Sequence, residues 1–134
     1  MSEPQTPAKT VLIADDDETT VMFLEATARK LGHETIGVSN GKEVIEQANV
    51  HRPDLILLDL LMPDIDGYTD LRILRSNWRT REIPIIVISG YAEQKTAQKC
   101  LTAGANHYLH KPVTFDQVRE AINRFLPPEI PAKT

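Results

Sequence analysis

The stretch that most constrains this chain is an apolar run ending at an aspartate, within the segment LILLDLLMPDIDG at residues 55–67. Leu55–Leu58 is too short for a helix of its own and is typical of a strand buried on both faces in a parallel sheet. Asp59 follows directly, and Pro63 prevents a central strand from continuing. Because ligands of open α/β sheets bind at the carboxyl ends of strands, Asp59 is either a candidate for chemistry or only a turn former or helix cap.

The rest of the chain alternates between short apolar runs and segments of helical periodicity. The other predicted strands are residues 11–14, 35–38, 85–88 and 106–110. The five predicted helices carry their inward faces at Val21, Leu24, Ala28 and Leu31; at Val44 and Ala48; at Tyr68, Leu71, Leu74 and Trp78; at Ala97, Cys100, Leu101 and Ala103; and at Val118, Ala121, Ile122 and Phe125. A strand followed by a helix, five times over, predicts an α/β fold with a doubly wound parallel sheet, connected by right-handed crossovers.

Local signals mark where several of these helices begin and end. Gly32 stands where a helix C-terminal cap is expected. Asn40 followed by Glu43 is a plausible N-terminal cap, and Thr114 with Gln117 forms a capping box. These signals support the predicted order of elements.

The length of 134 residues predicts one domain with a sizeable core. We expect a disordered N-terminal tail at residues 1–9, a folded domain at residues 10–126 and a proline-rich C-terminal tail at residues 127–134. The chain shows no secretory signal and no apolar run long enough to span a membrane. Its only cysteine, Cys100, cannot form an internal disulfide, so we expect a soluble cytoplasmic protein without membrane insertion.

The net charge of −4 argues against a direct nucleic-acid partner. Four arginines do gather locally, but no aromatic residues are interleaved with them as a stacking surface would require. We therefore expect a solvated helix end at Arg72, Arg75, Arg79 and Arg81.

Polar residues with chemical potential follow four of the predicted strands. Asp15 and Asp16 follow the first strand, Asp59 the third, Ser89 the fourth and Lys111 the fifth. Carboxyl ends of parallel strands share one edge, so these groups should converge. Three carboxylates would resist joint ionisation unless a cation lies among them, and Mg²⁺ is typically held by one or two carboxylates plus phosphate oxygens. With an ammonium and a hydroxyl, this is the inventory that phosphoryl transfer needs.

At this point the chain resembles the response-regulator receiver domain of two-component signalling, and is similar to its single-domain chemotaxis-type members. The resemblance covers roughly residues 10–126 and is carried by the acidic pair Asp15-Asp16, by LLDLLMPDIDG, by Val87-Ile88-Ser89-Gly90 and by Tyr108-Leu109-His110-Lys111-Pro112. It implies a flavodoxin-like (βα)5 fold with strand order 2-1-3-4-5.

The resemblance also implies a role for each matched residue. Asp59 would accept a phosphoryl group from a phosphohistidine of a sensor histidine kinase or a histidine phosphotransfer protein. Asp16 and Asp59 would bind Mg²⁺ directly, Asp15 mainly through water, and Leu61 through its backbone carbonyl. Lys111 would pair with the phosphoryl oxygens, with a cis peptide bond to the following proline.

The same resemblance implies a signalling switch. Ser89 would move toward the phosphoryl group and Tyr108 would rotate inward, changing the surface of the fourth helix, fifth strand and fifth helix. That surface would bind a downstream protein, and a homodimer through it is a further expectation. Neither Leu61 nor Tyr91 can orient a hydrolytic water as an acidic or amide residue would, so we expect slow self-dephosphorylation.

Two other functions remain open from the sequence. Asp15-Asp16-Asp17-Glu18-Thr19 also fits the D-x-D-x-T nucleophile motif of haloacid-dehalogenase-like phosphatases, with Asp15 as nucleophile. No acidic pair ends a strand beyond Lys111 and no cap insertion is present, which disfavours this enzyme. A receiver-like binding module that is never phosphorylated is the third reading, although all the acidic residues and the lysine are retained. We expect a phosphoacceptor signalling protein rather than an enzyme.

Overall fold

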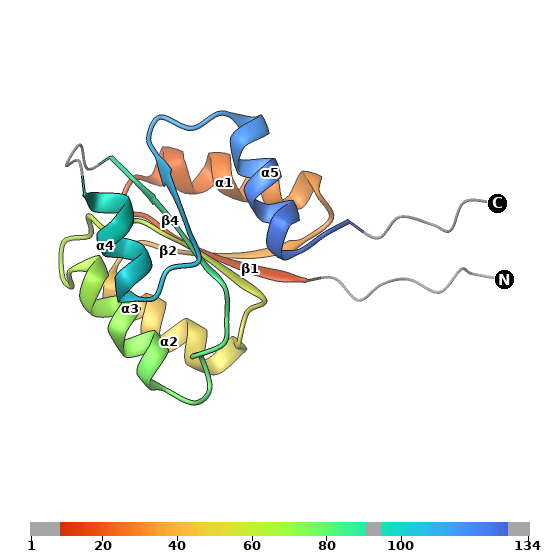
Figure 1. Cartoon of the computed structure of the whole chain (residues 1–134). Coiled ribbons are helices and arrows are strands. Elements are labelled where there is room, and N and C mark those ends of the chain that lie inside the picture. The colour runs from red at the N-terminus through yellow and green to blue at the C-terminus, as the bar shows by residue number, and fades with distance from the viewer. Residues whose placement is uncertain (1–8, 91–94, 129–134) are drawn as a thin grey trace, which may run out of the picture.

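The computed structural model describes residues 9–90 and 95–128, and in this part of the chain strands and helices alternate (Figure 1). In chain order the elements are β1 (Thr10–Ala14), α1 (Glu18–Lys30), β2 (Glu34–Val38), α2 (Gly41–His51), β3 (Leu55–Leu58), α3 (Gly67–Ser76), β4 (Ile85–Ser89), α4 (Thr96–Ala103), β5 (His107–His110) and α5 (Phe115–Phe125). The order of elements predicted from the apolar runs is confirmed.

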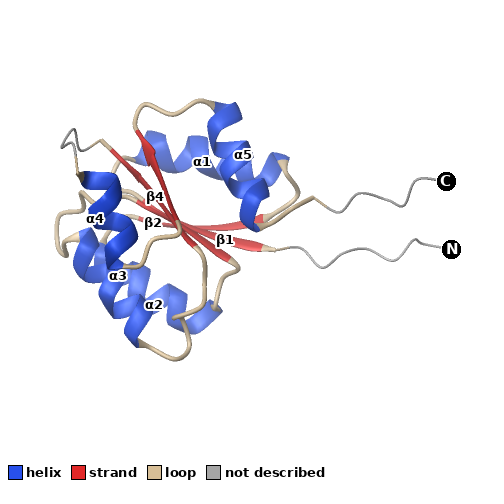
Figure 2. Cartoon of the chain, in the orientation of Figure 1, coloured by secondary structure: helices blue, strands red, loops and turns tan. Residues whose placement is uncertain are grey.

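The strands form one parallel sheet in the order β2-β1-β3-β4-β5. Helices α1 and α5 cover one face of this sheet, and α2, α3 and α4 cover the other (Figure 2). Covering both faces explains why every residue of β3 and β4 is buried, and why all of them except Ser89 are apolar. The flavodoxin-like order implied by the resemblance is confirmed.

Alternate residues of the central strands divide the interior into two cores. Leu12, Ile56 and Val87 pack in the core beneath α2, α3 and α4, together with Cys100. Their neighbours along the strands pack in the other core, against α1 and α5. This core includes Val11, Leu55, Leu57 and Ile86 from the strands and Val118 and Ile122 from α5. This period of two fixes the register of the strands and therefore the place where each strand ends.

The helix signals read from the sequence are largely confirmed. The Asn40 side chain accepts a hydrogen bond from the Glu43 N–H at 2.9 Å. Thr114 and Gln117 form the reciprocal bonds of a capping box at the start of α5. Gly32 follows α1 with a φ of 95°, which a residue with a Cβ adopts only under strain.

Two predicted helix faces are wrong in part. Helix α3 ends at Ser76, so Trp78 lies in the following loop and its side chain is 67% exposed. In α4 the buried residues are Thr96 and Cys100, while Ala97 and the 51% exposed Leu101 point to solvent. The first error arose because the apolar pattern was extended past the end of α3. The second arose because a polar residue, Thr96, takes an inward position in α4.

The arginine-rich segment is not a simple solvated helix end. Arg75 is half-buried and donates hydrogen bonds to the carbonyl oxygens of Gly104 and Ile83 at 2.8 and 2.6 Å, and to the Asn106 side chain at 2.7 Å. Asn106 itself, predicted as the first residue of a strand, instead precedes β5 and accepts the Ile85 N–H through its side chain. The roles of Arg75 and Asn106 depend on partners distant in the sequence, which the local sequence pattern does not reveal.

Candidate functional site

The carboxyl ends of the strands bring the predicted polar residues together. Asp15 follows β1, Asp59 follows β3, and Lys111 follows β5. Backbone bonds hold these positions in line with the sheet: the Asp59 N–H donates to the Ala14 carbonyl at 2.9 Å, and the Lys111 N–H donates to the Ser89 carbonyl at 2.9 Å. The rigid sheet therefore sets the spacing of the side chains that extend from its edge.

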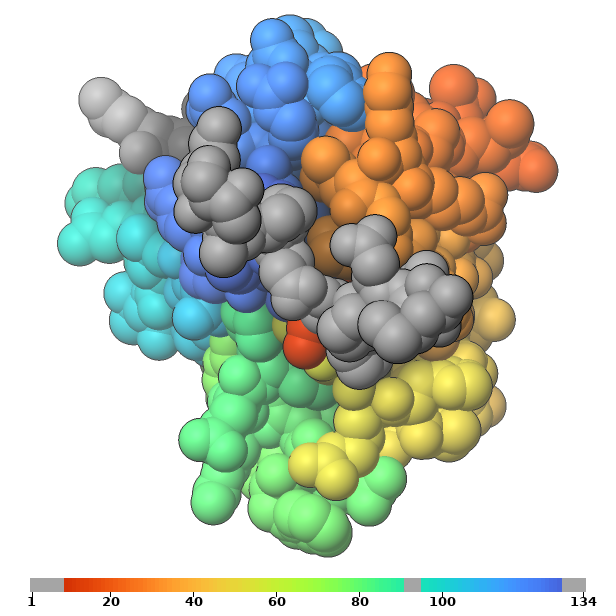
Figure 3. Space-filling model, turned by 90° about the vertical axis from the view of Figure 1, so that its right-hand side faces the viewer, coloured from red at the N-terminus to blue at the C-terminus, as the bar shows by residue number. Residues whose placement is uncertain are grey.

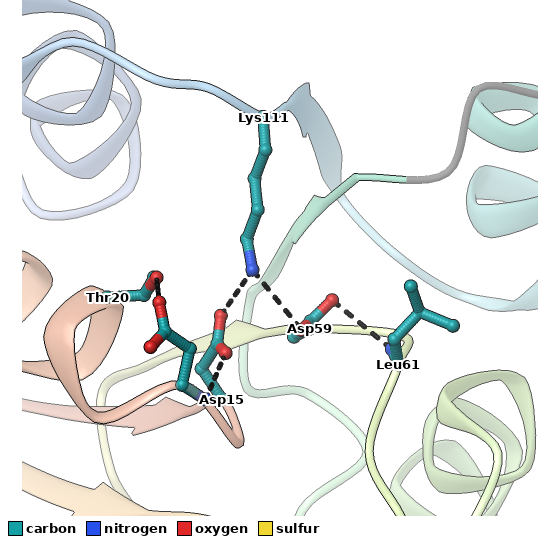
Figure 4. Close-up of polar contacts among 6 residues, drawn as sticks. Asp15, Thr20, Asp59, Leu61 and Lys111 are labelled. Atoms are coloured by element: carbon teal, nitrogen blue, oxygen red, sulfur yellow. Dashed lines mark hydrogen bonds and ion pairs between the residues drawn. The ribbon is translucent and has the colours of Figure 1, made fainter.

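Lys111 reaches down between two buried carboxylates (Figure 4). Its Nζ lies 2.6 Å from Oδ2 of Asp15 and 3.3 Å from Oδ2 of Asp59. These carboxylates are only 1% and 4% exposed, respectively. The other oxygen of each accepts a backbone N–H: Oδ1 of Asp15 from Asp17 at 2.8 Å, and Oδ1 of Asp59 from Leu61 at 3.2 Å.

The electrostatics of this cluster follow from burial and from like charge. Burial raises the pKa of Asp59, and the neighbouring charge of Asp15 raises it further. Burial lowers the pKa of Lys111, but its hydrogen bond to Asp15 and the charge of Asp59 more than offset this, so the pKa of Lys111 lies above its ordinary value. The lysine is therefore a cation at neutral pH.

The donor set fits a hard divalent cation. Asp15, Asp16 and Asp59 each offer a carboxylate oxygen, and these oxygens lie within 4.8 Å of one another. Asp15 and Asp59 share the Lys111 ammonium, and burial together with the charge of Asp15 raises the pKa of Asp59. A bound Mg²⁺, which prefers oxygen ligands and retains several waters, would relieve this repulsion. The exposed side chain of Asp16 leaves one side of the cluster open to solvent.

An acidic hollow of about 510 Å³ adjoins the cluster beside α1 and β2. Its lining includes Asp15 and Asp16 together with Glu18, Glu25 and Glu43. Such a concentration of carboxylates favours the approach of cations.

Ser89 and Tyr108, the two predicted switch residues, lie on the neighbouring strands β4 and β5. Ser89 is the last residue of β4 and is fully buried. Tyr108 pairs with Val87 across the β4–β5 ladder, and its half-buried side chain packs against the core beneath α2, α3 and α4. Burial raises the pKa of the Tyr108 hydroxyl, with further contributions from Cys100 and Asp59.

Two further features of the site concern the peptide bond after Lys111 and the side chain of Leu61. The Lys111-Pro112 peptide bond is cis, as predicted. Leu61 has a side chain that is 46% exposed beside Asp59, whereas Tyr91 lies outside the described residues.

One residue near the site has no role in our interpretation of the sequence. The Thr20 hydroxyl donates to Oδ2 of Asp17 at 2.6 Å, which steadies the turn whose N–H binds Asp15 (Figure 4). The spacing of an aspartate just before a helix and a threonine three residues later is the signal that could have found it.

Comparison with known proteins agrees with this geometry. The family model of the response regulator receiver domain matches residues 11–123. The chain belongs to the response regulator receiver domain family. It is a receiver domain of the kind found in two-component systems.

Similar receiver proteins align over nearly their whole length. The polar-differentiation response regulator DivK of Brucella anthropi is 30% identical over 118 residues, covering 88% of this chain and 96% of DivK. A response regulator of Chloroflexus aurantiacus has a TM-score of 0.84 and 32% identity, covering 89% of this chain and 98% of that one.

A third similar structure bears on the metal. The receiver domain of the sensor histidine kinase PA1611 from Pseudomonas aeruginosa has a TM-score of 0.81 and 31% identity, with coverage of 89% and 98% of the two chains. That structure has a magnesium ion coordinated in its active-site cleft.

In the described part of the present chain, no helix is both long and apolar enough to cross a membrane.

Proposed function

We propose that this receiver domain is a phosphorylation-dependent switch in which Asp59 accepts a phosphoryl group from a phosphohistidine of a sensor histidine kinase or histidine phosphotransfer protein. One carboxylate oxygen of Asp59 attacks phosphorus, the P–N bond to the donor histidine breaks, and an acyl phosphate forms. The electron pair of the broken bond returns to the imidazole of the donor.

The residues around Asp59 would stabilise the transferred phosphoryl group. Lys111 holds a positive charge against the phosphoryl oxygens and releases Asp59 from its present ion pair as it does so. The Ser89 hydroxyl donates a hydrogen bond to the same group. Asp15, Asp16, Asp59 and the Leu61 backbone carbonyl would hold Mg²⁺, which supplies charge neutralisation to the transferring group.

The observation that supports this proposal best is the convergence of a buried carboxylate with a lysine and two further carboxylates at one sheet edge. Asp59 lies 3.3 Å from the Lys111 ammonium, and the acidic oxygens lie within 4.8 Å of one another. A carboxylate destabilised by burial and by like charge is a better nucleophile toward phosphorus than one that is fully solvated.

The output of the switch would be a change at the surface formed by α4, β5 and α5. A phosphoryl group adds close to two negative charges at Asp59, and a hydrogen bond from Ser89 would shift packing next to Tyr108. A downstream protein target would bind this surface, which could also form a homodimer. We place this activity in the cytoplasm, in line with the single cysteine of the sequence.

The phosphatase alternative makes Asp15 the nucleophile instead. Asp15 is the more tightly paired carboxylate, because its oxygens bind the Lys111 ammonium at 2.6 Å and the Asp17 N–H at 2.8 Å. We therefore favour Asp59 and propose a phosphoacceptor that assists its own phosphorylation without turning over an external substrate. A receiver-like module that is never phosphorylated remains the other alternative.

One experiment separates these functions. The full chain is incubated with Mg²⁺ and acetyl phosphate, and intact mass is measured for one added phosphoryl group. We expect labelling of the wild type and of Asp116→Asn, a matched loss of an exposed carboxylate on α5, and no labelling of Asp59→Asn. Circular dichroism checks that each variant is folded.

Other outcomes identify the alternatives. Labelling retained in Asp59→Asn and lost in Asp15→Asn, or steady hydrolysis of phosphate esters, would support the phosphatase. A folded wild type that takes up no phosphoryl group from acetyl phosphate or from a phosphorylated histidine donor would support the binding module.

A further inference from the structure

A rigid turn presents an exposed tryptophan at the end of the molecule opposite the acidic site. Trp78 is the only tryptophan in the sequence and precedes β4 in the loop after α3. The turn is held by the Thr80 N–H, which donates to the Asn77 carbonyl, and by the Arg79 N–H, which donates to the Asn77 side chain, both at 3.0 Å. Asn77 also donates to the Asn49 side chain on α2. Trp78 is therefore fixed in place while largely exposed to solvent.

Two arginines flank this ring. The guanidinium carbons of Arg52 and Arg79 lie 6.0 and 5.4 Å from the centre of the Trp78 ring. Arg79 also donates from Nε to the Asn49 carbonyl at 3.1 Å, whereas the guanidinium of Arg52 has no polar partner in the described part of the chain. A guanidinium stacked on an aromatic face keeps its in-plane N–H donors available for a carboxylate.

A hollow of about 270 Å³ adjoins the ring and carries both signs of charge. Its lining includes Trp78, Arg52 and Arg79 together with Asp54 and Glu82. Asp54 accepts the Thr10 N–H at 2.9 Å, but Glu82 is exposed and forms no hydrogen bond or ion pair with the described residues. A cavity of roughly 150 Å³ can take up a benzene molecule, so this hollow is large enough for an aromatic ring.

We propose that Arg52, Trp78, Arg79 and Glu82, here called the Trp78 patch, form a self-complementary surface through which two copies of this chain associate. About a two-fold axis, Trp78 of each copy enters the hollow of the other, and Arg52 of each meets Glu82 of the other. Tryptophan and arginine are the residue types that most often anchor such interfaces.

The charge of the patch favours a second copy over an acidic or a basic partner. A two-fold interface brings a surface against itself, so a surface that carries an unpaired glutamate beside arginines is complementary to itself. Figure 3 looks at this end of the molecule, where the chain near residue 52 (yellow) and the chain after α3 (green) lie side by side. A lone tryptophan and three charged residues fall short of the roughly 800 Å² per subunit of a stable interface, so we expect weak association.

This inference goes beyond the phosphorylation switch and is independent of it. Arg52 precedes β3 and Glu82 precedes β4, so the patch lies at the amino ends of the strands, away from Asp59. Association through it would leave the acidic site and the surface of α4, β5 and α5 open to other proteins.

Because Trp78 is the only tryptophan, its fluorescence reports on this patch alone. We expect sedimentation velocity of the unphosphorylated full chain, from about 10 µM to about 1 mM, to show a rising share of dimer. The tryptophan emission should shift to the blue over the same range, because the ring leaves water. The Asp59→Asn variant should behave identically, which separates this test from that of the phosphorylation switch.

Charge exchange tests the pairing. Arg52→Glu and Glu82→Arg should each weaken self-association at least about tenfold, because like charges then face each other. An equimolar mixture of the two variants should associate as the wild type does, because every pair is again of opposite sign. Glu34→Arg, at an exposed position on β2 outside both surfaces, is the matched control and should associate normally. No dimer near 1 mM, a dimer with unchanged tryptophan emission, or a mixture that fails to associate would overturn the proposal.

Discussion

Asp70 is a carboxylate placed where almost nothing compensates its charge. It lies in α3, is fully buried, and neither of its oxygens has a hydrogen-bond partner among the described residues. A Cβ at Gly41 would lie 2.7 Å from its Oδ2, which shows how closely α2 packs against it. Burial, followed by the charges of Asp64 and Asp66, raises its pKa from 3.8 to about 7. At neutral pH this side chain is therefore divided between a neutral and a charged form.

We expect the stability of the protein to fall as pH rises because of Asp70. Below pH 4 the group is protonated in both the folded and unfolded states and contributes nothing. Between pH 4 and 7 the unfolded chain releases this proton while the folded chain retains it, so folding becomes less favourable with each step up in pH. Above pH 7 the full penalty, at most about 4 kcal/mol, has accumulated.

The Asp70→Asn variant tests this directly. Its free energy of unfolding in urea, measured at pH 5, 6, 7 and 8, should decline less with pH than that of the wild type and should exceed the wild-type value at pH 8. Asp116→Asn removes an exposed carboxylate and should leave the wild-type slope unchanged. Parallel pH profiles for wild type and Asp70→Asn would show that Asp70 is not the group responsible.

The burial of Asp70 could not be predicted from the sequence. Asp70 stands in a helix between apolar positions that were correctly predicted as inward, and nothing local distinguishes it from a solvated carboxylate. Its burial follows from the approach of α2 at Gly41, a contact between segments that are 29 positions apart. In contrast, Asp59 was identified because a strand of four apolar residues leads directly into it.

At the scale of elements, Arg75 connects α3 to the segments around it. One guanidinium binds the carbonyl oxygens of Gly104, Ile83 and Arg81 and the side chain of Asn106. Gly104 ends α4, and Asn106 leads into β5. The Arg75 side chain of α3 thus hydrogen-bonds the carboxyl end of α4 and the segment that leads into β5.

We expect Arg75→Met to lower the free energy of unfolding by about 2 to 4 kcal/mol, because partly buried carbonyl oxygens lose their donors. Arg75→Lys should recover little, since an ammonium cannot reproduce the forked geometry of a guanidinium. Arg81→Met, at an exposed position in the same arginine-rich segment, should cost well under 1 kcal/mol. Urea unfolding measures all three, and equal effects at positions 75 and 81 would contradict the assignment.

The elements themselves could be predicted from the sequence because their signals are local. The apolar runs of β1, β3 and β4 and the capping box at Thr114 depend on neighbours in the chain. The roles of Arg75 and Asn106, and the exposed faces of α4, depend on segments that fold against them. Prediction failed where a side chain bridges two elements rather than supporting its own.

At the scale of the whole molecule, the acidic edge stores unfavourable charge that a cation would remove. We expect millimolar Mg²⁺ to stabilise the folded chain, by about 1.4 kcal/mol at ten times its dissociation constant, because the unfolded chain has no such site. For a chain of this size, that corresponds to a rise in melting temperature of roughly 3 to 6 °C.

Asp16→Asn provides the comparison for this effect. It removes the exposed carboxylate of the cluster and leaves the ion pairs of Lys111 in place. Its melting temperature should respond much less to Mg²⁺, with sodium chloride of equal ionic strength as the control. An equal response of wild type and variant would show that the cation acts elsewhere.

The convergence of the site was predictable because parallel strands end at a common edge, whatever their separation in sequence. The Trp78 patch was not, since its members come from loops whose approach is set by the packing of α2 and α3. The prediction that Trp78 belongs to a helix face concealed a position where a large aromatic side chain is 67% exposed to solvent.

The ion pair between Asp15 and Lys111 joins residues 96 positions apart, one just after the first strand and the other just after the last. During synthesis from the N-terminus, all three carboxylates leave the ribosome well before this lysine. A nascent or truncated chain that ends before β5 therefore carries the acidic groups without the ammonium that faces them. Under the proposed function, such a chain would lack the cation that pairs with the phosphoryl group, so phosphorylation would require the polypeptide through Lys111.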